Sequence, residues 1–103
     1  MIKLVFTTGR ETFSIEIDNK IIVYKDRRFS KGFQFMPIIG NVNLISIMSR
    51  NRIPKEIVEL MKEANSGKNL IEYKKALDDE ALFIIVKRDA ALKGCVFQKR
   101  IDL

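Results

Sequence analysis

The 103-residue sequence contains no histidine, no tryptophan and a single cysteine, Cys95. A disulfide within the chain is therefore excluded, and so is a zinc site built from cysteine and histidine. Without histidine there is neither a Ser-His-Asp triad nor an imidazole acid or base. We accordingly expect a protein that is not an enzyme and that holds no metal and no cofactor.

Long hydrophobic runs are also missing. None approaches the roughly 20 residues of a transmembrane helix. The apolar stretch near the N-terminus is too short for a signal peptide, and no cleavage site follows it. We therefore expect a soluble, cytoplasmic protein with no membrane partner. Hydrophobic residues still make up 47% of the chain, which suffices for the core of a single domain over residues 1–103.

Negative charge is scarce in one half of the chain. The net charge is +6, and residues 1–53 carry nine Lys and Arg against four Asp and Glu. Residues 54–103 are nearly balanced, with ten basic and nine acidic residues. A lopsided basic field indicates a polyanionic partner for the first half. A charge that only keeps the chain in solution explains the same excess equally well.

Alternating β-branched and aromatic residues predict about six strands. In the second of them Phe13, Ile15 and Ile17 share one face. We expect the fifth to be a central strand, because it is apolar on both faces. In the last, Cys95, Phe97 and Ile101 are expected to point inward. The expected strands cover residues 2–8, 12–18, 20–25, 33–38, 81–86 and 95–101.

Helical signals lie between the fourth and fifth of these strands. Pro54 suits a first helical position, and apolar residues recur at helical spacing from Ile57 to Ala64. Residues 69–77 fit a helix or a strand, and the pair Asn69 and Glu72 favours a helix through a capping box. A short helix over residues 44–49, capped by Asn43, is a further expectation, and a buried strand there is the alternative.

This order of elements predicts an α+β fold. We expect a mostly antiparallel sheet of about six strands, with one or two helices inserted between strands four and five. A small barrel with one helix closing its end fits the same order.

The densest mixture of positive charge and aromatic rings lies in residues 24–38. Cations neutralise phosphates, and flat rings stack on bases. This stretch therefore predicts a binding site for single-stranded nucleic acid. The candidate phosphate-binding residues are Arg27, Arg28 and Lys31, and the candidate stacking residues are Phe29, Phe33 and Phe35.

Part of this stretch reads Lys31-Gly32-Phe33-Gln34-Phe35-Met36. It resembles the Lys-Gly-Phe-Gly-Phe-Val core of RNA-recognition motifs, which occurs in close variant in cold-shock domains. The resemblance implies that Phe33 and Phe35 stack on consecutive bases while Lys31 meets a phosphate. Residues 9–20 lack the helix of an RNA-recognition motif, so the strand–turn–strand order fits the cold-shock arrangement better.

Other interpretations of the stretch stay open. Phe33 and Phe35 can instead be core residues of a sheet. Met36 and Ile38 would then lie on the opposite face, which a second sheet layer, a subunit or a ligand must cover. The rival to single-stranded DNA or RNA binding is therefore a protein–protein interaction module. Through this apolar face the protein would form a homodimer, or it would inhibit or regulate a larger enzyme.

A second group of basic residues lies toward the C-terminus. If the last two strands pair, these side chains extend the positive surface, although solvated positions on ordinary strands give the same pattern. The group comprises Lys87, Arg88, Lys93, Lys99 and Arg100.

Overall fold

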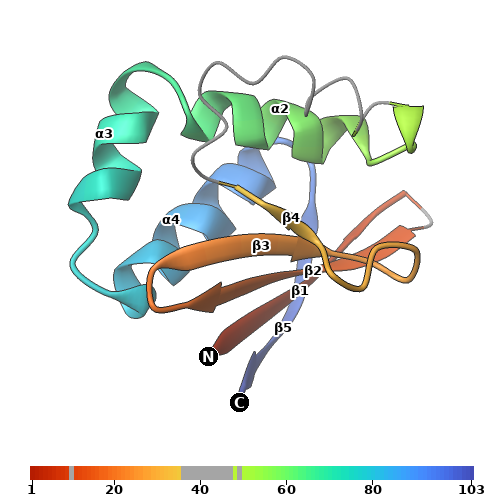
Figure 1. Cartoon of the computed structure of the whole chain (residues 1–103), viewed down its shortest axis with the longest axis horizontal. Helices are drawn as coiled ribbons and strands as arrows, with labels where there is room; N and C mark the ends of the chain where they lie inside the picture. Colours follow the sequence, from red (N-terminus) through yellow and green to blue (C-terminus); the bar gives the residue numbers. More distant parts are fainter. Residues whose placement is uncertain (10, 36–47, 49) are drawn as a thin grey trace.

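In a computed structural model of the chain, which describes residues 1–9, 11–35, 48 and 50–103, five strands form one antiparallel sheet. The described helices lie together on one side of this sheet (Figure 1). The strand order is β4-β3-β2-β1-β5. The strands are β1 (Ile2–Thr8), β2 (Glu11–Asp18), β3 (Ile21–Lys25), β4 (Phe33–Gln34) and β5 (Val96–Asp102). The helices are α2 (Lys55–Ala64), α3 (Gly67–Lys75) and α4 (Asp79–Leu92).

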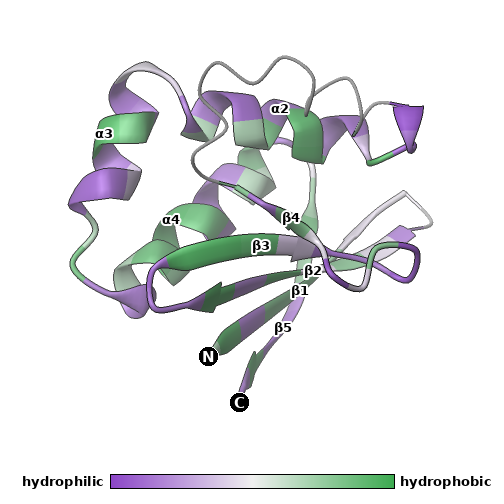
Figure 2. Cartoon of the chain, in the orientation of Figure 1, coloured by the Kyte–Doolittle hydropathy of each residue, from purple (hydrophilic) through white to green (hydrophobic). Residues whose placement is uncertain are grey.

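Alternation along the strands decides which face of the sheet is buried. Because successive side chains point to opposite faces, every second residue of β1, β2 and β3 meets the helices. Figure 2 shows the resulting hydrophobic segments along these strands. The core residues on this face are Ile2, Leu4, Phe6, Phe13, Ile15, Ile17, Ile22 and Tyr24.

Helix α4 covers the sheet most directly, since it contacts β1, β2 and β5. Its buried residues are Leu82, Val86 and Ala90, spaced at four-residue intervals. The helix begins after Asp78, whose carboxylate accepts a hydrogen bond from the Ala81 backbone N at 2.9 Å. Helix α2 packs beside it, so both helices and the sheet enclose one core.

The strand expected over residues 81–86 is wrong, because these residues lie inside α4. Helix α4 continues beyond this stretch to Leu92. The misleading feature is the apolar run Phe83-Ile84-Ile85, which lies between the buried helix residues Leu82 and Val86. Ile84 is 64% exposed, so the run does not mark a strand buried on both faces.

The sheet is open, with β4 and β5 at its two edges, so the alternative of a small barrel is wrong. Five described strands replace the expected six, and three described helices replace the expected one or two. The four early strands are confirmed, although residues 36–38 of the fourth lie outside the described residues. The helices over residues 54–65 and 69–77 are confirmed as α2 and α3, but α3 is preceded by Ser66, not by a capping Asn69. Most of the expected helix over residues 44–49 lies outside the described residues.

A bulge changes which side chains of β5 face the helices. Phe6 pairs with Phe97 and Val5 with Lys99, and the register shifts between these two pairs. The extra residue in β5 reverses which of its following side chains point toward the helices. Arg100 therefore points to the helix side and Ile101 to the opposite face, which corrects the expectation that Ile101 is inward.

Candidate nucleic-acid interface

The connection between β3 and β4 is a turn held by Asp26. Its carboxylate accepts hydrogen bonds from the backbone N of Arg28 at 2.8 Å and of Phe29 at 3.0 Å. The hydroxyl of Tyr24 donates a third, at 2.6 Å. Burial, followed by this contact with Asp26, raises the pKa of Tyr24, so the tyrosine stays a neutral donor. The turn is thus fixed by local bonds of a kind that Asp residues commonly form.

Gly32 is required by the backbone of this turn. Its φ of +75° suits glycine, and a Cβ here would lie 2.3 Å from the carbonyl oxygen of Tyr24. The Lys31-Gly32 step of the motif therefore has a structural cause that is independent of any ligand.

The aromatic rings of the stretch pack inward. Phe35 is fully buried, and Phe33 lies opposite Tyr24 on the core face. Phe29 and Phe33 are partly buried and contact each other, with ring centroids 5.2 Å apart. The expected platform of three exposed rings is not formed, and Phe35 is a core residue that no base can reach in this fold.

The cations of the stretch do reach the surface. Arg27, Arg28 and Lys31 are exposed, and Arg28 lies 5.5 Å from the centroid of the Phe29 ring. The Nη2 atom of Arg28 donates a 3.0 Å hydrogen bond to the backbone oxygen of Arg52. This bond joins the turn to the segment before α2, where Arg50 is also exposed.

We refer to these five residues, Arg27, Arg28, Lys31, Arg50 and Arg52, as the cationic end. Within the described part of the chain, only Arg28 among them forms an ion pair, at 3.8 Å from Asp26. Sequence reasoning left Arg50 and Arg52 out of the site. The only signal was two basic residues before Pro54, and their proximity to the turn depends on the tertiary fold.

A cavity of about 640 Å³ lies between the start of β2 and the turn. It is lined by Glu11, Thr12, Asp26, Arg27 and Arg28. A smaller hollow of about 340 Å³ adjoins it on the sheet, since both include Thr12 and Asp26 in their lining. Glu11 and Thr12 are further residues that the sequence did not single out.

None of the described elements covers the face of the sheet opposite the helices (Figure 1). Charges of both signs lie there, because Lys3 is paired in register with Glu16, and Glu16 forms a 3.2 Å ion pair with Lys25. Val5 and Val23 lie among them and are partly exposed. This face is thus mixed in character, unlike the cationic end.

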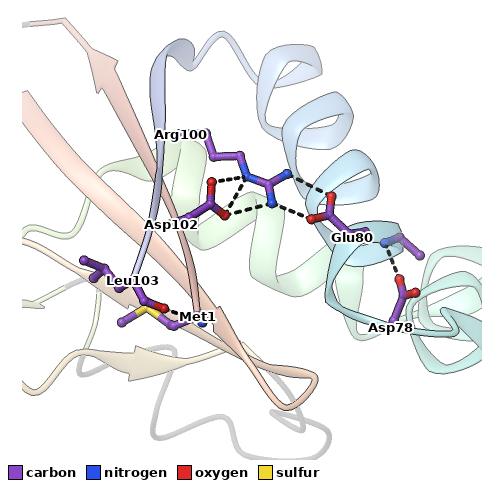
Figure 3. Close-up of polar contacts among 7 residues, drawn as sticks. Met1, Asp78, Glu80, Arg100, Asp102 and Leu103 are labelled. Carbon is purple, nitrogen blue, oxygen red and sulfur yellow. Dashed lines mark hydrogen bonds and ion pairs between the residues drawn. The ribbon is translucent and has the colours of Figure 1, made fainter.

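The second basic group is largely neutralised by neighbouring carboxylates. Arg100 lies between Glu80 and Asp102 and donates hydrogen bonds to both (Figure 3). The remaining ion pairs of the group are Arg88 with Glu72 and Asp89, and Lys93 with Glu63. The Lys87 ammonium lies 4.4 Å from the centroid of Phe97.

Cys95 and the acidic residues offer no reactive centre in the described residues. Cys95 is 4% exposed, and burial raises the pKa of its thiol to about 11, so the thiol is protonated at neutral pH. The described part of the chain contains no group of three or more Cys, Asp or Glu residues placed to hold a metal ion. Likewise, no helix in that part is both long and apolar enough to span a bilayer.

In comparisons with known proteins, no protein-family model, no curated protein and no solved structure matches this chain. The function is therefore inferred from the residues and their geometry alone.

Proposed function

We propose that this protein binds nucleic acid through its cationic end and catalyses no reaction. The observation that carries the proposal is the hydrogen bond from Arg28 to the Arg52 backbone. It unites two cationic segments that are far apart in the sequence. Four of the five cations form no ion pair with another described residue, so their charge is available to an anion.

Phosphates are the anions that such a surface fits best. Each phosphate that a Lys or Arg neutralises releases counterions, which favours binding at low salt. Arginine adds a planar fork of donors that matches a phosphate oxygen pair. If three or four phosphates are neutralised, log K should fall with log salt at a slope of about −2 to −3 for a single strand.

The turn is preorganised for this contact. Asp26 fixes its backbone through two N–H groups, and Gly32 permits its close return past Tyr24. Arg52 adopts a left-handed conformation with φ of +59°, which costs a non-glycine residue about 1–2 kcal/mol. The bond from Arg28 to the Arg52 carbonyl helps to offset that cost. Less ordering is then required when the ligand binds.

The rings support the surface from beneath. Phe29 and Phe33 pack against each other and the core, and the Arg28 guanidinium lies against Phe29. In this proposal the contribution of the rings is to hold the arginine in place, and the affinity comes mainly from phosphate contacts.

The test is a titration against single-stranded DNA, single-stranded RNA and duplex DNA at several salt concentrations. Arg27→Ala should weaken binding to all sequences and reduce the salt slope by about one phosphate contact, without changing the melting temperature. Lys74→Ala is a matched control, because Lys74 is exposed on α3, outside the cationic end. Folded protein that binds none of these nucleic acids at low salt would overturn the proposal.

A second candidate is a homodimer formed through the uncovered face of the sheet. Val5, Val23 and Ile101 are partly exposed there, and no described element covers them. A two-fold interface would bury this face against itself and could bring Lys3 of one copy near Glu16 of the other. Sedimentation that finds only monomers at high protein concentration would reject this candidate. Val23→Lys should dissociate a dimer if one forms.

A further inference from the structure

The cavity beside the turn has sides of opposite charge. Its lining includes Arg27 and Arg28 from the turn, and Glu11 and Thr12 from the start of β2. These two segments are neighbours, because β2 pairs with β3 up to Ser14 opposite Lys25. A ligand in the cavity would therefore lie next to residues of both charges.

The two carboxylates of the cavity differ in their availability. Asp26 already accepts hydrogen bonds from Tyr24, Arg28 and Phe29, and its side chain is 8% exposed. Glu11 is exposed, and its carboxylate has no hydrogen bond or ion pair with another described residue. Glu11 is thus the acceptor that a ligand can use.

A free carboxylate next to a phosphate site repels a nucleic-acid backbone. The edge of a base can compensate, because amino groups on bases donate hydrogen bonds to carboxylates. The N4 amino group of cytosine is a donor of this kind, and acidic side chains accept from it. Thymine has an acceptor oxygen at the same ring position, which Glu11 would repel.

We propose that this cavity accepts one unstacked base that carries an amino group, cytosine in preference to thymine, with Glu11 as the acceptor. The adjoining phosphate would lie on Arg27 and Arg28. This inference rests on the proposed function and specifies which part of the nucleic acid is recognised. The volume of about 640 Å³ falls within the range of small-ligand sites.

The inference also predicts a preference for single strands. A base enters such a cavity only after it leaves its stack, and a duplex must break a base pair as well. Binding to a single strand avoids that cost.

The experiment compares oligo-dC and oligo-dT of equal length at one salt concentration. The wild-type protein should bind oligo-dC at least about five-fold more tightly. Glu11→Gln should weaken oligo-dC binding and strengthen oligo-dT binding, because an amide can donate to the thymine oxygen. Glu59→Gln makes the same charge change on α2, outside the residues that line the cavity, and should leave the preference unchanged.

The outcomes separate this inference from the proposed function. If wild-type protein binds both oligonucleotides equally, or if Glu11→Gln strengthens both equally, Glu11 is only an unfavourable charge. The base-recognition inference then fails while the proposed function stands. If wild-type protein binds neither oligonucleotide at low salt, the proposed function itself fails. The dC-to-dT ratio of the wild-type protein decides the inference even if a variant does not fold.

Discussion

The cationic end and the second basic group contain the same number of Lys and Arg residues, but their charges are used differently. At the cationic end only Arg28 pairs with a carboxylate of the described chain. In the second group Arg88, Lys93 and Arg100 each lie against at least one carboxylate. The availability of a basic cluster therefore depends on which acidic side chains the fold brings to it.

Arg88, Lys93 and Arg100 each have an acidic partner on a different element. Glu63 belongs to α2, Glu72 to α3 and Glu80 to the first turn of α4. In the described part of the chain, Asp26 is the one acid that forms an ion pair with the turn between β3 and β4, and it also accepts backbone hydrogen bonds there. The second basic group thus takes part in contacts between elements, whereas four of the five cations at the cationic end form no ion pair with another described residue.

The largest expected effect separates the rings of the stretch from its cations. Phe35→Ala should reduce the free energy of unfolding by about 3–5 kcal/mol, because it removes a fully buried ring and leaves a cavity. Denaturant unfolding measures this loss, which is a large part of the stability of a small domain. Arg27→Ala should unfold like the wild type. An equally stable Phe35→Ala variant would show that the ring is not part of the core.

The sequence predicted the early strands and α2 because their hydrophobic periodicity is regular and because turn or capping residues mark their ends. It failed at α4, where Phe83 and Ile84 extend the apolar run beyond the buried face. Strand pairing was not predictable in detail either, since the bulge that reverses Arg100 and Ile101 leaves no clear mark in the composition.

For the site, the sequence placed the cations and the rings in one stretch, and it left open whether Phe33 and Phe35 are exposed or belong to the core. The spacing of Phe33 and Phe35 correctly placed both on one face of a strand, yet it could not show that the helices cover that face. The contact between Arg28 and Arg52 joins residues 24 positions apart. Such long-range contacts are set by packing, which no local pattern contains.

The next effect tests whether the cationic end alone is available to a polyanion. The triple variant with Arg27, Lys31 and Arg50 changed to Gln should reduce the salt slope of binding by about 2, because each single-strand phosphate contact contributes about 0.7. The matched triple variant with Arg88, Lys93 and Arg100 changed to Gln carries the same net charge. It should retain the salt slope and lose some stability. Equal losses of binding in both variants would mean that only net charge matters.

Two tyrosine–aspartate pairs offer a finer comparison. Tyr24 donates to Asp26 at the cationic end, and Tyr73 donates to Asp89 beside the second basic group at 3.0 Å. Tyr24→Phe and Tyr73→Phe should each cost about 1.5–3 kcal/mol of stability, the usual contribution of a hydrogen bond to a charged group. Only Tyr24→Phe should also weaken nucleic-acid binding, since Asp26 orders the turn. A binding loss in Tyr73→Phe as well would show that the effect is one of general stability.

The smallest effect is a pH dependence that belongs to the second basic group. The hydrogen bond from Arg100 holds the pKa of Glu80 below its ordinary value of 4.5. Ionised Glu80 therefore stabilises the folded protein at pH values above the pKa that Glu80 has in the unfolded chain. This stability is lost as the pH falls through the lower pKa of Glu80 in the folded state.

The melting temperature of the wild type should exceed that of Glu80→Gln at pH 7, and the difference should vanish in strong acid. In protein that carries Arg100→Gln, the further change Glu80→Gln should no longer lower the melting temperature. Added salt should reduce the difference seen in the wild type, because the Glu80–Arg100 pair is exposed. A difference between wild type and Glu80→Gln that persists in strong acid would mean that Glu80 acts through packing and not through its charge.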